Sequence, residues 1–304
     1  MIALLARAAL ILLTLFGAAS LALSKAWGWP ERASESLFLV YQNKTRGGAD
    51  YTFVIDAEGG QPEPLDYEGH SLMAHACSPD GRWLAFTAAG ELYRQQIGGA
   101  PERLTSEALG GAAQSALTQL SISDGGVVLM TSIGYPNRLW LIDGDTATPL
   151  NLPLNYALPY AALSPDALWV AFEGSDIPYD YIYLGDLRAN TISQRRIVGS
   201  HPNWIGDGQM IAFETAFYAD LQVNSRVRLF DVSRGRGYLF RRLEFPDFGV
   251  TWSPDGRRIA FVDYSGDPYL SLFVGDLFTG ARRALVGVSS ALTGACFLGF
   301  RPGV

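Results

Sequence analysis

The feature that most constrains the fold is an internal repeat with a period of about 44 residues. Short apolar segments end at equivalent positions along the chain: Asp56, Gln96, Asp143, Asp186, Asp231 and Asp276. Successive members are 40, 47, 43, 45 and 45 residues apart. Self-similarity at this period, built from short strands and turn residues, is typical of a β-propeller, in which each repeat forms one blade.

A second series of phrases keeps the same phase. Each combines a tight turn with an apolar run: CSPDGRWLAF from Cys77, LSPDALWVAF from Leu163, WIGDGQMIAF from Trp204 and WSPDGRRIAF from Trp252, with a degenerate copy, SISDGGVVLM, from Ser121. Ser-Pro-Asp-Gly is turn chemistry, because Pro fixes φ, Asp caps the turn and Gly accepts a positive φ. The run that follows predicts a strand buried on both faces between neighbouring blades. The Asp residues that close the third strands are expected to cap turns and not to act as catalytic carboxylates.

The repeat count predicts six blades over residues 37–304. The first unit begins at residues 36–41 and has no first strand of its own, whereas residues 294–303 follow the last unit and echo a first strand and its turn. We therefore expect the C-terminal strand to complete blade 1 and close the ring, which removes the open sheet edges.

The phrase Trp-Ser-Pro-Asp-Gly-x-x-Ile-Ala-Phe, followed by a strand that ends in Asp, resembles the TolB-type propeller repeat. The resemblance covers essentially everything after residue 36 and implies an all-β, six-bladed propeller. TolB proper carries an α/β domain before its propeller, and only residues 25–36 separate the first blade here from an N-terminal apolar run. Peptidase relatives append a hydrolase domain, and this chain has no Gly-x-Ser-x-Gly elbow.

The N-terminal segment predicts contact with a membrane. Residues 8–24 carry no charge and follow Arg7, a pattern that fits a membrane anchor or a secretory signal peptide. Trp27 and Trp29 come directly after the run, where an interfacial aromatic belt would lie, and this favours a retained single-pass helix. We expect residues 1–30 to form this anchor or signal segment and residues 31–304 to form the propeller, held in the periplasm at the inner membrane. Cleavage near residues 22–24 is the alternative.

Charge and cysteine content exclude several classes of protein. The net charge is −7 and the pI is about 5.0, whereas a nucleic-acid binder needs a basic surface. Two cysteines in 304 residues rule out a disulfide scaffold and a cysteine-based zinc cluster. Cys77 and Cys296 fall in neighbouring inner strands but are out of register in the repeat alignment. We therefore expect buried free thiols, with a disulfide as the alternative.

The predicted channel wall is poor in catalytic groups. His75 and His201 fall in first strands, which line the channel of a propeller, and no carboxylate does so; the nearest are Glu68 and Asp247 in the preceding loops. The sequence therefore predicts no catalytic residue, no metal and no cofactor. The alternative is a channel hydrolase or lactonase that uses His75, His201 and Asp247, for which several convergent carboxylates and amides would be needed.

Aromatic residues gather in the segments that join second and third strands or enter blade 4, which should all open on one face. They are Tyr135, Pro136, Tyr156, Tyr160, Pro178, Tyr179, Tyr181, Phe217, Tyr218, Tyr264, Pro268 and Tyr269. Tyr and Pro supply rigid contact area at low entropic cost, which suits a protein-binding face. The alternatives are that these rings pack their own loops or start strands, or that they form the mouth of a small-ligand site.

These features together predict a non-enzymatic interaction module. We expect a membrane-anchored extracytoplasmic propeller that serves as an accessory or assembly subunit of a larger membrane complex, with other proteins as partners. The alternatives are a soluble periplasmic protein of envelope maintenance, as the TolB resemblance implies, and the channel enzyme described above.

Overall fold

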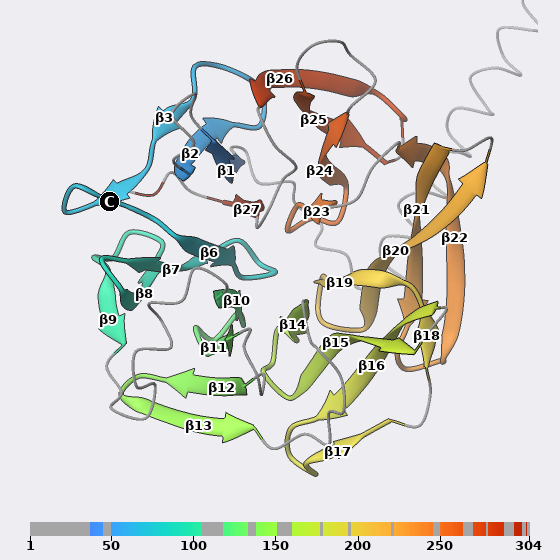
Figure 1. Cartoon of the computed structure of the whole chain (residues 1–304), viewed down its shortest axis with the longest axis horizontal. Coiled ribbons are helices and arrows are strands. Elements are labelled where there is room, and N and C mark those ends of the chain that lie inside the picture. The colour runs from blue at the N-terminus through green and yellow to red at the C-terminus, as the bar shows by residue number, and fades with distance from the viewer. Residues whose placement is uncertain are drawn as a thin grey trace, which may run out of the picture.

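The computed structural model describes the propeller region of the chain. Its described residues are 37–44, 50–104, 118–132, 138–150, 160–176, 179–193, 196–219, 222–245, 250–263, 270–277, 279–288, 295–299 and 302. These residues form six antiparallel sheets arranged as blades around a centre (Figure 1). The predicted all-β, six-bladed propeller is therefore confirmed. The predicted anchor or signal segment, with Arg7, Trp27 and Trp29, lies outside the described residues.

Each blade has four strands in sequential order, numbered outwards from the centre. The first strands are β27 (Cys296–Leu298), β6 (Ala74–Cys77), β10 (Thr118–Ile122), β14 (Ala161–Leu163), β19 (Ser200–Ile205) and β23 (Thr251–Trp252). The second strands are β1 (Phe38–Lys44), β7 (Trp83–Ala88), β11 (Val128–Ser132), β15 (Trp169–Asp176), β20 (Met210–Ala219) and β24 (Arg258–Asp263). The third strands are β2 (Asp50–Asp56), β8 (Glu91–Gln96), β12 (Arg138–Asp143), β16 (Tyr179–Asp186), β21 (Gln222–Asp231) and β25 (Leu270–Asp276). The fourth strands are β3 (Glu63–Pro64), β9 (Glu102–Leu104), β13 (Thr146–Leu150), β17 (Thr191–Ile192), β22 (Arg236–Phe245) and β26 (Arg282–Val288).

Three short strands lie outside this scheme. The hairpin of β4 (Asp66–Tyr67) and β5 (His70–Ser71) joins blade 1 to blade 2. The strand β18 (Ile197–Val198) pairs with β16 at the edge of blade 4. No helix among the described residues has the length and apolar character needed to cross a membrane.

The turns between first and second strands follow the predicted chemistry. In blade 2 the Ser78 hydroxyl donates to Asp80 Oδ1 at 2.6 Å, and Asp80 Oδ1 accepts the N–H of Arg82 at 3.0 Å. The third-strand Asp residues cap turns as well: Asp186 Oδ1 accepts the N–H of Arg188 at 2.9 Å, and Asp276 Oδ1 accepts that of Thr279 at 2.8 Å. The repeated Asp residues thus have the structural role that the sequence predicts.

Apolar cores lie between neighbouring blades, as the continuously apolar second strands require. Residues 84–88 of β7 are all buried, and so are residues 259–262 of β24. One cluster joins Val40 and Leu298 of blade 1 to Leu84 and Phe86 of blade 2, and similar clusters fill the other junctions. Burial between blades therefore supplies the main hydrophobic stabilisation of the ring.

The C-terminal strand closes the ring. β27 pairs with β1 in antiparallel register over three residue pairs, from Phe38 opposite Leu298 to Val40 opposite Cys296. Because β27 comes from the end of the chain and β1 from its beginning, blade 1 joins the two. The prediction that the C-terminal strand completes blade 1 is confirmed.

The prediction of free thiols is wrong. Cys77 of β6 and Cys296 of β27 form a disulfide, with their Cα atoms 5.6 Å apart. The repeat alignment treats the two inner strands as equivalent and so places the cysteines out of register. The short β27, which lies against β6, brings Cys296 level with Cys77 instead.

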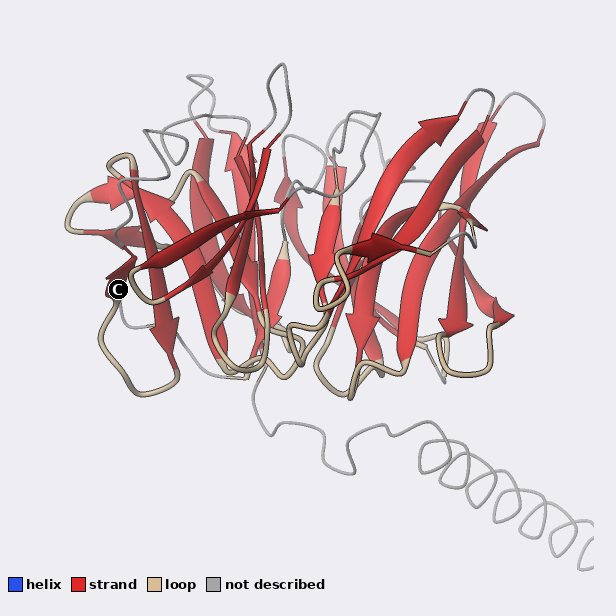
Figure 2. Cartoon of the chain, turned by 90° about the horizontal axis from the view of Figure 1, so that it is seen from below, coloured by secondary structure: helices blue, strands red, loops and turns tan. Residues whose placement is uncertain are grey.

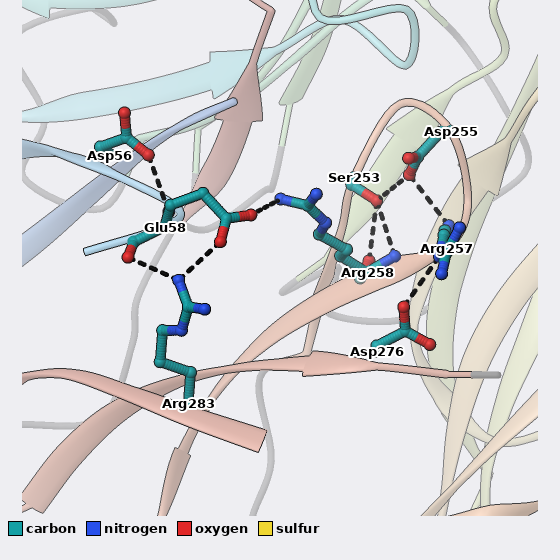
Figure 3. Close-up of polar contacts among 8 residues, drawn as sticks. All are labelled: Asp56, Glu58, Ser253, Asp255, Arg257, Arg258, Asp276 and Arg283. Atoms are coloured by element: carbon teal, nitrogen blue, oxygen red, sulfur yellow. Dashed lines mark hydrogen bonds and ion pairs between the residues drawn. The ribbon is translucent and has the colours of Figure 1, made fainter. Parts of the chain in front are cut away.

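The junction between blades 1 and 6 is bridged by an ion-pair network on the surface (Figure 3). Glu58, in the turn after β2, contacts two arginines of blade 6: Arg258 Nη1 lies 2.7 Å from Glu58 Oε1, and Arg283 Nη1 lies 2.5 Å from Glu58 Oε2. A second pair within blade 6 joins Arg257 Nε to Asp276 Oδ2 at 2.8 Å. Glu58 is half exposed, so these pairs add to the junction without being its main support.

Candidate functional site

The antiparallel strands give the propeller two distinct faces. We call the face with the turns between first and second strands the turn face. The opposite face, where second strands end and third strands begin, we call the hairpin face. The chain also enters each first strand from the hairpin face, because the first strand runs antiparallel to the second. Figure 2 shows the blades edge-on, with the strands running between these two faces.

The predicted aromatic set falls partly within the described structure. Tyr160 precedes β14 and is exposed on the hairpin face. Tyr179 and Tyr181 are residues of β16, and Phe217 and Tyr218 are residues of β20. The prediction that these four lie in loops is therefore wrong, because β15, β16, β20 and β21 extend to the ends of their hairpins. The remaining members lie outside the described residues: Tyr135, Pro136, Tyr156, Pro178, Tyr264, Pro268 and Tyr269.

The Tyr181 ring packs against a residue of its own blade. Its ring lies beneath the guanidinium of Arg196, with Cζ 5.3 Å from the ring centroid, and its backbone pairs with Val198 of β18. Tyr181 is only partly exposed. For this residue, the alternative that the ring packs against its own segment fits the structure better than a free contact surface does.

Exposed apolar side chains gather on the hairpin face. The described residues contain five exposed large hydrophobic side chains: Tyr51, Met73, Ile97, Tyr160 and Val198. Four of them lie at the hairpin face, at the start of third strands or beside the starts of first strands. Ile97, which follows β8, lies at the turn face, because its N–H bonds to the carbonyl of Arg82 directly before β7. We call Tyr51, Met73, Tyr160 and Val198 the apolar rim.

A polar cluster lies beside the rim, where blades 4, 5 and 6 meet. His201 of β19 has Nδ1 3.9 Å from Glu173 Oε1 of β15 and 4.0 Å from Glu214 Oε2 of β20. The Tyr160 ring packs against the His201 ring, with the centroids 4.2 Å apart. A member of the apolar rim therefore covers a histidine that stands between two carboxylates.

An irregularity in β19 positions His201. The pairing of β19 with β20 shifts between Ser200 and Asn203, which marks a β-bulge, and His201 itself has a φ of +51°. Gly199 precedes the bulge with a φ of +154°, and a Cβ there would lie 2.4 Å from the Phe213 ring and 2.6 Å from the Glu214 carbonyl oxygen. A side chain at residue 199 is thus excluded by space, and the bulge turns His201 out of the regular strand pattern.

Burial dominates the ionisation of the cluster. It raises the pKa of Glu173 to about 7, and the His201 N–H bonded to that carboxylate opposes the effect. Burial also lowers the pKa of His201 to about 4, against a smaller opposite contribution from the charge of Asp180. The pKa of Tyr160 is raised by burial and then by the charges of Glu173 and Glu214. At neutral pH the imidazole is therefore uncharged, while Glu173 is close to its midpoint.

Both carboxylates hold the backbone of the next blade. Glu173 Oε1 accepts the N–H of His201, and Glu214 Oε1 accepts the N–H of Val250 at 2.8 Å, directly before β23. Gln42 of β1 occupies the same repeat position and donates from Nε2 to the Met73 carbonyl at 2.6 Å, directly before β6. In blades 1, 4 and 5 the residue after the second-strand aromatic thus joins its blade to the start of the next one.

The two glutamates were missed from the sequence. The predicted channel wall consists of first strands and the loops before them, whereas Glu173 and Glu214 come from second strands. A signal for them was available, because the repeated Ala-Phe is followed by Glu in two copies, by Thr87 in a third and by Val262 in the last. A polar residue that replaces Val or Thr at one position of a buried repeat indicates a specific partner.

Of the other predicted channel groups, those that the structure describes lie in other blades than this cluster or in the loop between blades 1 and 2. His75 of β6 is 5% exposed, and burial lowers its pKa to about 4, with a smaller opposite contribution from the backbone of Val40. Asp247 lies outside the described residues, and Glu68 lies in the turn between β4 and β5. Within the described ranges, no three His, Cys, Asp or Glu side chains are grouped so that they could hold a metal ion.

No protein-family model matches the chain, and no curated protein matches it in sequence. Solved structures do match. The crystal structure of TolB from Acinetobacter baumannii is similar with a TM-score of 0.63 and 16% identity, over 91% of this chain and 69% of that one. The structure of a putative TolB from Agrobacterium tumefaciens gives a TM-score of 0.54 and 18% identity, over 85% and 91%. A chain of a nidogen/laminin complex gives a TM-score of 0.55 and 12% identity, over 86% and 98%.

These likenesses concern the fold. The chain has the six-bladed propeller arrangement of the TolB structures, which confirms the resemblance seen in its repeats. The same architecture occurs in the nidogen/laminin structure, so the arrangement alone does not specify one function. The disulfide adds a separate indication, because such bonds form and persist outside the cytoplasm.

Proposed function

We propose that the protein is a non-enzymatic protein-binding module whose partner docks on the hairpin face. The apolar rim supports this proposal: four of the five exposed large hydrophobic side chains in the described structure lie on that face. A partner that covers this face would bury all four side chains together, and exposed apolar surface of this kind marks interaction sites when it is contiguous. Tyr160 adds an aromatic ring with a polar tip, a type of residue enriched at binding hot spots.

The polar cluster supports a binding role over a catalytic one. A general acid or base must be free to approach a substrate proton. Glu173 and Glu214 are each engaged with the backbone of the neighbouring blade, so moving either carboxylate would loosen a joint of the ring. We therefore assign these residues to the support of the hairpin face, with Tyr160 packed on His201 above them.

The proposed setting is the extracytoplasmic side of a bacterial inner membrane. The disulfide and the TolB-like fold support an extracytoplasmic propeller, and the uncharged segment 8–24 with Trp27 and Trp29 supports a retained helix. A membrane tether raises the effective concentration of the propeller near other membrane proteins. We propose that it acts there as an accessory or assembly subunit of a larger complex.

The test is the intact mass of the native protein extracted from membranes, with the co-purifying proteins identified in the same sample. The proposal predicts a mass that includes residues 1–24 and a stoichiometric membrane partner. A mass that begins near residue 23 or 25, in protein released without detergent, would contradict the anchor and favour a soluble envelope protein. Retention in the membrane with no stoichiometric partner would contradict the subunit role.

A further inference from the structure

The closing strand β27 differs from the other first strands in how it is attached. The first strands of blades 2–6 are followed along the chain by the second strand of their own blade. In blade 1 no turn joins β27 to β1, because the two strands come from opposite ends of the chain. Their pairing extends over only three residue pairs, from Phe38–Leu298 to Val40–Cys296. Ring closure thus depends on a short, non-covalent strand pairing.

The same strand completes two apolar cores. Phe297 packs in the cluster between blades 6 and 1, whereas Cys296 and Leu298 pack in the cluster between blades 1 and 2. All three residues of β27 are buried. Loss of this strand would therefore open both junctions and leave β1 as an unpaired edge.

In addition to this apolar packing, a disulfide and a hydrogen bond hold the segment of β27 to blade 2. One is the disulfide between Cys296 and Cys77. The other is the hydrogen bond from the Gly299 N–H to the Gly81 carbonyl at 2.8 Å. A Cβ at Gly81, which has a φ of +70°, would lie 2.9 Å from Gly299 N, so the turn of blade 2 fits closely against the residue after β27. Of these two contacts only the disulfide is covalent. It links Cys77 in blade 2 to Cys296 at the end of the chain, so residues 77–296, which include blades 3–6, form a covalently closed loop.

We propose that the Cys77–Cys296 disulfide is a redox-dependent latch, and that its reduction releases β27 and opens blade 1 while the other blades stay folded. A dithiol supplies the two electrons: its thiolate attacks one cysteine sulfur, the S–S bond breaks, and the second thiol resolves the mixed disulfide. Two cysteine thiols and one oxidised dithiol result. Cys77 is the more exposed cysteine of the pair, so its sulfur is the one that we expect the thiolate to attack.

Hydrogen–deuterium exchange of the full-length protein, with and without dithiothreitol, tests the latch. We expect exchange at residues 296–299 and 38–40 to accelerate on the order of 100-fold after reduction, because local opening no longer strains a covalent link. Peptides from β20 and β21 in blade 5, which pair over ten residues, serve as the internal control and should accelerate much less, because they report only the loss of global stability. Unchanged exchange at residues 296–299, or equal acceleration in every blade, would overturn the proposal.

The double variant Cys77→Ser/Cys296→Ser provides the matched control. In oxidising buffer it should show the exchange pattern of the reduced wild type, and dithiothreitol should change nothing further. Protection of residues 296–299 equal to that of the oxidised wild type would contradict the latch. If this variant does not fold, the reduced wild-type protein alone decides between the two outcomes stated above.

Discussion

Neighbouring blades are held together by different sets of contacts at two junctions, the one between blades 1 and 2 and the one between blades 4 and 5. Both place a polar residue after the second-strand aromatic, and both use it to bind the start of the next first strand: Gln42 to the Met73 carbonyl, and Glu173 to the His201 N–H. The first junction adds a disulfide. The difference follows from chain connectivity, because blade 4 is one continuous segment whereas blade 1 is assembled from both ends of the chain.

The same polar contact thus joins blades 1, 4 and 5 to the blades that follow them, and a covalent bond is added where the chain is interrupted. Hydrogen bonds between blades can stabilise a junction whose strands are already held together along the chain. A short terminal strand has no such support, because its release costs only local contacts. The experiments below separate these two contributions, beginning with the covalent one.

Removal of the disulfide should have the largest effect. Cys77→Ser/Cys296→Ser opens a loop with a sequence separation of 219 residues, for which the chain-entropy relation gives a loss of about 5 kcal/mol in the free energy of unfolding. Denaturant unfolding followed by circular dichroism measures the loss. A decrease below about 1 kcal/mol would show that the closing junction does not depend on the bond, since native disulfides in small secreted domains typically contribute more.

The titration of Glu173 at the junction between blades 4 and 5 should have the second-largest effect on the free energy of unfolding. The folded-state pKa of Glu173 is raised from 4.5 to about 7, so its contribution to stability is fully present below pH 4.5 and is lost as the pH rises to about 7. Glu173→Gln keeps an acceptor for the His201 N–H but does not titrate. Relative to this variant, the wild type should lose about 3 kcal/mol between pH 4.5 and pH 8. Parallel stability curves for the two proteins would contradict the assignment.

Truncation of the glutamate between blades 5 and 6 should cost somewhat less. Glu214→Ala leaves the buried N–H of Val250 without its acceptor, and a loss of about 2 kcal/mol is expected. Glu214→Gln retains an acceptor and should lose less than half as much. Thermal unfolding of the three proteins at one pH provides the ranking. Equal losses for Ala and Gln would mean that the hydrogen bond is not what Glu214 contributes.

The smallest effect should be at the surface of the closing junction. Glu58→Ala removes the ion pairs to Arg258 and Arg283 that join blade 1 to blade 6, yet the side chains of Glu58 and Arg283 are more than half exposed. The loss should stay below about 1 kcal/mol. It should also vanish near 1 M salt, where charges are screened within about 3 Å. A larger, salt-independent loss would mean that this network, and not the disulfide alone, keeps the ring closed.

The repeat made the architecture predictable. The period of the Asp-terminated strands and the Ser-Pro-Asp-Gly turns set the blade number, the strand order and the closure by the C-terminal strand. These features are local in sequence, and each copy repeats the same turn chemistry, so several copies support one inference. The buried runs after the turns likewise form the inter-blade cores that their composition predicts.

The site was less predictable, because its contacts join different repeats. His201 lies beside Glu173 and Glu214 only after a β-bulge in β19, and the alignment of repeats cannot place a bulge. The disulfide was missed for the same reason, since β27 does not follow the register that its aligned copies suggest. The place of Tyr160 before a first strand follows from the repeat alone, whereas its role in binding stays a prediction.

The claim that the hairpin face binds a protein partner is tested by three matched surface variants. Met73→Glu and Val198→Glu each place a charge on the apolar rim, at side chains that are 53% exposed, whereas Ile97→Glu places one on the turn face, at a side chain that is 43% exposed. Quantitative co-purification from membranes should show at least about a ten-fold loss of the partner for the rim variants, as expected for a contact worth more than 1.4 kcal/mol, and no loss for Ile97→Glu. Full retention of the partner by both rim variants, or its loss in the Ile97 variant alone, would contradict the claim.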